Sequence, residues 1–174
     1  EEVVQKHFLD SLSLIYAVEL DDGMKVLDLG TGAGFPGVPL KIAFPQLDMV
    51  LLDSLNKRIK FLNEVIDELG LKKISAYHGR AEEFAQKSQY REQFDLVVSR
   101  AVANLSTLSE YCIPFVGIGG SFVSYKSGEV DEELDQSANA IELLGGCLED
   151  VEEFTLPDSD IGRSLVVIEK IESL

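Results

Sequence analysis

Cysteine, long apolar runs and positive charge are all scarce in this chain. The two cysteines, Cys112 and Cys147, lie far apart, and no further metal ligands surround them at metal-binding spacing. This argues against a disulfide scaffold or a zinc ribbon and favours a reducing compartment, so we expect a cytoplasmic protein without a bound metal. No stretch approaches the roughly 20 uninterrupted apolar residues that a membrane-spanning helix needs, and we expect no membrane contact.

Basic residues are outnumbered by acidic ones, with 15 Lys and Arg against 31 Asp and Glu and a formal net charge of −16. Up to Lys126 there are 13 basic and 17 acidic residues, a net charge of −4, whereas from Ser127 onward there are 2 and 14, a net charge of −12. Nucleic-acid-binding proteins usually carry a basic patch, so this composition is not typical of them. If the protein does bind RNA, the acidic segment should face away from it, because like charges repel.

The length of 174 residues suits one domain with a real core. The chain does not begin with methionine, and apolar residues recur at helical spacing from the start, at Val4, Phe8, Leu12 and Ile15. We therefore expect an N-terminal helical segment over residues 1–20 whose beginning is missing, followed by one domain over residues 21–174. The first residues lack the basic stretch and apolar core of a secretory signal.

Short apolar runs alternate with amphipathic stretches along the chain. The predicted strands are Met24–Leu29, Asp48–Asp53, Lys72–Tyr77, Phe94–Ser99, Gly120–Tyr125, Cys147–Thr155 and Ser164–Ile171. The predicted helices are Gly37–Phe44, Leu55–Leu69, the start of Ala81–Arg91, Leu105–Pro114 and Glu129–Leu144. Strands separated by helices predict a doubly wound, mostly parallel α/β sheet. The loop of about eight residues between the last two strands is short for a parallel crossover, so the sheet should end in an antiparallel hairpin.

A glycine-rich loop follows the first predicted strand, in the segment VLDLGTGAGFPGVPL (Val26–Leu40). Such a loop lies at the carboxyl end of a strand, where sheets of this kind bind ligands, and glycine lets the backbone approach a ligand closely. Asp53 ends the next strand, 19 residues after Gly34. Its carboxylate can accept hydrogen bonds from two ribose hydroxyls, so loop and acid together predict an adenosine-type ligand rather than a plain tight turn beside a surface carboxylate.

The charge near the loop distinguishes between two adenosine ligands. The spacing Gly32-x-Gly34-x-x-Gly37 formally fits a dinucleotide fingerprint, but Asp28 would repel a pyrophosphate and Pro36 has no N–H to donate to one. A cationic amino group or sulfonium would instead be attracted to Asp28. These features favour S-adenosyl-L-methionine over NAD as the cofactor.

Two further strand ends are expected to complete the pocket. Ala81 and Glu82 follow the third strand and could flank an adenine, although an acid in the first turn of a helix is also stabilised by the helix dipole. Arg100 follows the fourth strand, where we expect it to face the cleft rather than form a surface ion pair.

Several segments together resemble the glucose-inhibited division protein B family, whose members are bacterial 16S rRNA guanine-N7 methyltransferases. They are KHFLDSL (Lys6–Leu12), the glycine loop, LLDSLNKRIKFLNEV (Leu51–Val65), HGRAEEF (His78–Phe84), FDLVVSRAVANL (Phe94–Leu105) and, more weakly, SYKS (Ser124–Ser127) and RSLVVIEK (Arg163–Lys170). The resemblance implies a class I methyltransferase fold with a seven-stranded sheet. It implies cofactor contacts at Gly30, Phe35, Ala81, Glu82 and Arg100, with Gly32 in the same loop and Asp53 as the ribose-binding acid.

The implied reaction is an in-line transfer of the sulfonium methyl group to guanine N7. Because N7 has a free lone pair near neutral pH, no general base is needed, and we assign no catalytic residue. The implied partner is 16S rRNA or the small ribosomal subunit, with Arg100, Lys126 and Arg163 as candidate RNA contacts. The oligomeric state stays open, with a monomer as the working expectation. The alternatives are a methyltransferase acting on a small molecule or protein, and a non-enzymatic nucleotide-binding module.

Overall fold

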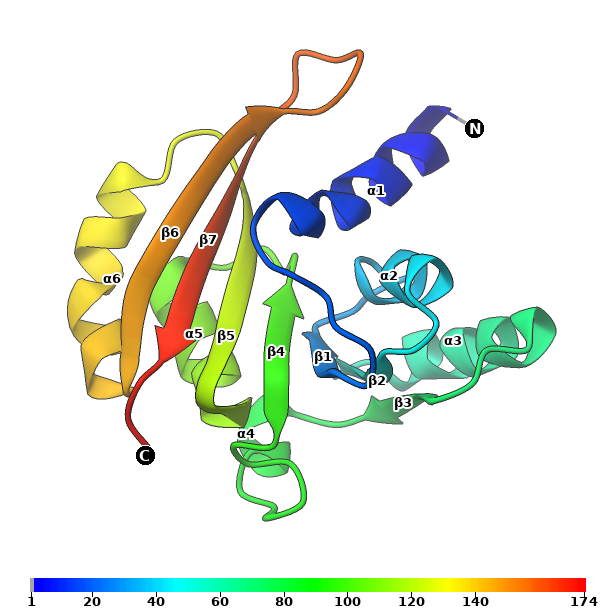
Figure 1. The fold of residues 1–174 in the computed structure, drawn as a ribbon. Coiled ribbons are helices and arrows are strands. Elements are labelled where there is room, and N and C mark those ends of the chain that lie inside the picture. The colour runs from blue at the N-terminus through cyan, green and yellow to red at the C-terminus, as the bar shows by residue number, and fades with distance from the viewer. Residues whose placement is uncertain (1) are drawn as a thin grey trace.

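A computed structural model describes residues 2–174 of the chain. Its strands are β1 (Lys25–Leu29), β2 (Asp48–Asp53), β3 (Ile74–His78), β4 (Phe94–Ser99), β5 (Val116–Ser127), β6 (Gly146–Thr155) and β7 (Gly162–Lys170). They form a seven-stranded sheet in the order β3-β2-β1-β4-β5-β7-β6 (Figure 1). The first five strands pair in parallel, whereas β7 runs antiparallel to both β5 and β6. The predicted α/β sheet and its antiparallel hairpin are confirmed.

Helices cover both faces of this sheet. They are α1 (Glu2–Leu12), the 3-10 helix η1 (Ser13–Tyr16), α2 (Gly37–Ala43), α3 (Asn56–Leu69), α4 (Ala81–Phe84), α5 (Leu105–Cys112), the 3-10 helix η2 (Ile113–Phe115) and α6 (Asp131–Leu143). Successive strand residues point to opposite faces, so one strand contributes to two cores. In β1, Leu27 packs into a core with α5 and α6, whereas Val26 packs into a second core with α2 and α3.

Most predicted elements have bounds within two residues of the observed ones, and the fifth strand differs most. As predicted, only the start of Ala81–Arg91 is helical: α4 ends at Phe84, and turns follow before β4. There Glu92 adopts a left-handed φ of 52°, and its backbone N–H donates to the carbonyl oxygen of Pro114. The fifth strand begins at Val116, four residues before Gly120, with a register shift against β4 between Phe94 and Leu96.

The N-terminal segment packs directly on the sheet. Leu14 of η1 is fully buried in the same core as Val26. The hydroxyl of Tyr125 in β5 donates to the carbonyl oxygen of Ser11 at 2.7 Å. Figure 1 shows α1 near the carboxyl end of β4, which is the end where the predicted ligand should bind. Within residues 2–174, no helix has both the length and the apolar character needed to cross a membrane.

Candidate active site

A cavity of about 510 Å³ opens at the carboxyl ends of β1, β2 and β4. The structure brings five of the predicted cofactor residues together in its wall: Gly30, Asp53, Ala81, Glu82 and Arg100. Tyr111 of α5, which the sequence did not single out, also lines it. A larger cavity of about 690 Å³ lies at the opposite end of the sheet, beside Met24 and the start of β5. We assign the ligand to the first cavity, because open parallel sheets bind ligands at the carboxyl ends of their strands.

Asp53 links the glycine loop to the start of α3. One carboxylate oxygen accepts a hydrogen bond from the backbone N–H of Gly32 at 2.9 Å, and the other accepts one from the N–H of Leu55 at 2.9 Å. The guanidinium of Arg58 lies 3.5 Å from the first oxygen. Each carboxylate oxygen has two lone pairs, so acceptor capacity remains for hydroxyl groups of a ligand in the cavity.

Gly34 is a position of the glycine loop that requires glycine, because its φ is 101°. A Cβ there would lie 2.8 Å from a methyl group of Val38 and 2.9 Å from one of Leu62. Gly32 also has a positive φ, and its N–H points to Asp53 rather than into the cavity. The loop therefore forms a tight turn. Its backbone is held by the side chains of Val38 and Leu62, which pack against Gly34, and by the carboxylate of Asp53.

Asp28 lies beneath this loop and does not line the cavity. Its side chain is fully buried, and one carboxylate oxygen accepts hydrogen bonds from the Thr31 hydroxyl at 2.7 Å and from the Gly37 N–H at 2.8 Å. The other oxygen has no partner among residues 2–174. From the sequence we expected this carboxylate to face the cationic part of the cofactor. The structure instead places it where it joins the two ends of the loop.

Burial raises the pKa of Asp28 to about 7, against the lowering effect of its two hydrogen bonds. An acid whose pKa is raised on folding binds more protons in the folded state, so stability falls as pH rises between its unfolded and folded pKa values. Between pH 5 and pH 8 we expect the wild-type free energy of unfolding to fall by about 2–3 kcal/mol through this residue, at about 1.4 kcal/mol per pKa unit.

Asp28→Asn mimics the protonated carboxyl and should lose this part of the pH dependence. Urea unfolding of both proteins at several pH values measures the difference. Asp22→Asn is a control, because Asp22 is exposed in the turn before β1. Parallel pH profiles for wild type and Asp28→Asn would contradict the prediction.

Phe35 does not line this cavity, although the sequence predicted a cofactor contact there. Its ring stacks on His7 of α1 with 5.2 Å between centroids, and the Arg100 guanidinium carbon lies 5.8 Å from its centroid. Phe35 therefore contacts the cavity wall through Arg100.

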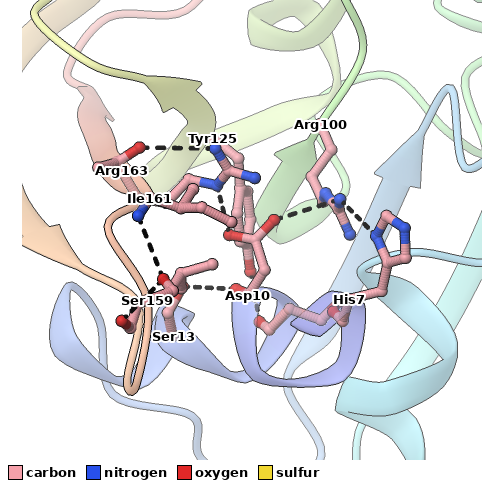
Figure 2. Close-up of polar contacts among 11 residues, drawn as sticks. His7, Asp10, Ser13, Arg100, Tyr125, Ser159, Ile161 and Arg163 are labelled. Carbon is pink, nitrogen blue, oxygen red and sulfur yellow. Dashed lines mark hydrogen bonds and ion pairs between the residues drawn. The ribbon is translucent and has the colours of Figure 1, made fainter. Parts of the chain in front are cut away.

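Another cavity, of about 630 Å³, adjoins the cofactor cavity and shares Arg100, Ala101 and Val102 with it. We call these two adjoining cavities the first and the second. The predicted RNA residues Lys126 and Arg163 also line it. Each basic group already has an acidic neighbour. Lys126 lies 2.9 Å from Glu133 of α6, and Arg100 and Arg163 both contact Asp10 of α1 (Figure 2).

Asp10 is the main residue of this region that the sequence did not identify. It lies within the KHFLDSL segment, but its partner Arg163 is 153 residues away, so no local pattern reveals the contact. The helical spacing around it indicated only an amphipathic helix.

Several solved structures with the same fold are methyltransferases, at low sequence identity, and the chain therefore has a class I methyltransferase fold. The YcgJ protein from Bacillus subtilis superposes with a TM-score of 0.75 at 13% identity, covering 96% of this chain and all of that one. A geranyl diphosphate C-methyltransferase from Streptomyces coelicolor, solved with S-adenosyl-L-homocysteine, superposes with a TM-score of 0.69 at 12% identity, covering 98% and 79% of the two chains.

Sequence comparison is more specific. The family described as GidB, rRNA small subunit methyltransferase G, matches residues 1–161. A ribosomal RNA small subunit methyltransferase G of Lachnoclostridium phytofermentans is 60% identical over 99% of this chain and 71% of its own length. One of Alkaliphilus metalliredigens is 55% identical over 99% and 72%. The chain belongs to the GidB family. The expected S-adenosyl-L-methionine-dependent methyltransferase is thereby confirmed.

Proposed function

We propose that this protein transfers the methyl group of S-adenosyl-L-methionine to N7 of a guanine in 16S rRNA, presented as RNA or within the small ribosomal subunit. The observation that carries the proposal is the pair of adjoining cavities with a shared wall at Arg100, Ala101 and Val102. One cavity holds the donor and the other admits the acceptor base. The relatives' name, ribosomal RNA small subunit methyltransferase G, supports the choice of substrate. Such a role would place the protein in the cytoplasm, and we expect it to act as a monomer.

The first cavity offers the groups that an adenosine-containing donor requires. Asp53 would accept hydrogen bonds from the ribose hydroxyls, and Ala81 and Glu82 would flank the adenine. Gly30 allows close backbone approach at the end of β1, where φ is 71°. The cofactor supplies an electrophilic methyl group on a sulfonium. The residues of this chain bind and orient it.

The second cavity has a charge that suits a nucleotide of RNA. Its lining contains three basic residues, Arg100, Lys126 and Arg163, against two acidic residues, Asp10 and Glu133. This leaves a local excess of one positive charge on a protein whose formal net charge is −16. A local excess of this kind can hold a phosphate while the surrounding acidic surface limits binding elsewhere.

No general base is required, because guanine N7 already carries a free lone pair. The residues therefore act by holding the base in line with the methyl group and by balancing charge. The product purine is cationic, and the carboxylates of Asp10 and Glu133 lie in the cavity that would contain it.

Incubation with labelled S-adenosyl-L-methionine and small ribosomal subunits tests the reaction. We expect label in 16S rRNA at a single guanine, and chain cleavage specific for N7-methylguanine should map it. RNA carrying 7-deazaguanine at that position should accept no label, because it has no nitrogen there. Labelling of a metabolite extract but not of ribosomal RNA or subunits would instead indicate a small-molecule methyltransferase.

A further inference from the structure

Asp10 joins three separate segments of the chain in the wall of the second cavity. Its carboxylate lies on α1 and is 2% exposed. One oxygen lies 3.2 Å from Nη2 of Arg100, directly after β4, and the other lies 2.9 Å from Nε of Arg163 in β7 (Figure 2). A single buried carboxylate therefore holds two guanidinium groups from different parts of the sheet.

The contacts of Arg100 leave one of its nitrogens available. Nη2 faces Asp10 and also lies 3.1 Å from Nδ1 of His7. Nη1 is buried and has no partner among the described residues. A buried guanidinium nitrogen without an acceptor is unfavourable, and Arg100 lines both cavities, so a bound ligand can supply the missing acceptor.

The cluster is not neutral. Arg100 and Arg163 carry two positive charges against one negative charge on Asp10, which leaves a net charge of +1. All three residues line the second cavity, and Arg100 also lines the first. S-adenosyl-L-methionine carries a sulfonium, whereas its product S-adenosyl-L-homocysteine is a neutral thioether at that position. In a partly buried site, one further positive charge in the cluster would penalise the donor more than the product.

We propose that Asp10 is a positioning residue for methyl transfer: it fixes Arg100 in the shared wall with Nη1 free, and its charge allows a cationic donor to bind beside two arginines. The inference rests on the proposed function, because it requires the donor to occupy the first cavity. It makes α1 part of the active site rather than a packing helix.

The test compares the affinities of both ligands by calorimetry. In Asp10→Asn the net charge of the cluster rises to +2, and we expect the affinity for S-adenosyl-L-methionine relative to S-adenosyl-L-homocysteine to fall about tenfold. Arg163→Gln lowers the net charge of the cluster to zero and should raise the affinity for S-adenosyl-L-methionine relative to S-adenosyl-L-homocysteine. The double variant Asp10→Asn/Arg163→Gln has a net charge of +1 again and should return the ratio toward the wild-type value.

Ser13→Ala is the matched structural control, because the Ser13 hydroxyl donates to the backbone carbonyl of Asp10 without touching its carboxylate. It should change melting temperature but not the ratio. Asp10→Glu keeps the charge and should keep most of the ratio. An unchanged ratio in both Asp10→Asn and Arg163→Gln overturns this inference and leaves the proposed function intact. Failure of the wild-type protein to bind either ligand overturns both.

Discussion

Asp53→Ala is expected to lower the affinity for S-adenosyl-L-homocysteine by about 100-fold, the largest effect of any single change in the cofactor cavity. Two hydrogen bonds from ribose hydroxyls to a carboxylate contribute about 1.5 kcal/mol each, and each 1.4 kcal/mol is a factor of ten. The change also frees the N–H of Gly32, which Asp53 holds at 2.9 Å, so the glycine loop loses its anchor on the cavity side. Calorimetric titration measures the affinity.

Asp48→Asn is the matched control for Asp53→Ala. Asp48 lies in the same strand but at its exposed amino end, away from the cavity. The Asp48→Asn variant should bind S-adenosyl-L-homocysteine with wild-type affinity. The circular dichroism spectra of both variants should match that of the folded wild-type protein. Affinity within twofold of wild type in Asp53→Ala would contradict a ribose-binding role for this carboxylate.

Most of the fold followed from the sequence because the strands are short apolar runs separated by amphipathic helices. Asp48–Asp53 and Phe94–Ser99 were predicted with the bounds that the structure has. The early start of β5 at Val116 could not be foreseen. There Val116 pairs with Phe94, and the Glu92 N–H donates to Pro114 nearby, and both are contacts between segments distant in the sequence.

The candidate site was predictable to the extent that it lies directly after strands. Gly30 and Arg100 each follow a strand, and such residues meet at one edge of a parallel sheet. Asp28 lies inside β1 instead. The sequence alone did not show that α2 packs over its side chain, which does not line the cavity. The contact between Asp10 and Arg163 joins opposite ends of the chain and required the structure.

Gly37→Ala is expected to lower the free energy of unfolding by about 4 kcal/mol. A Cβ at this position would clash with the buried Leu51 and lie 2.8 Å from the carboxylate oxygen of Asp28 that accepts the Gly37 N–H. Overpacking a core costs about 1–3 kcal/mol, and breaking the hydrogen bond to the buried Asp28 adds about 1–3 kcal/mol. Since φ of Gly37 is not positive, steric contact rather than backbone strain causes the loss.

Urea unfolding of Gly37→Ala beside Gly162→Ala separates this cause from a general intolerance of alanine. A Cβ at Gly162 would meet nothing within 4 Å, and its φ is not positive, so that variant should unfold like wild type. If Gly37→Ala does not fold, its fraction in the soluble lysate relative to Gly162→Ala gives the same comparison. A loss below about 1 kcal/mol in Gly37→Ala would mean that α2 can move away from Leu51 without strain, and that Asp28 does not hold the loop against the sheet.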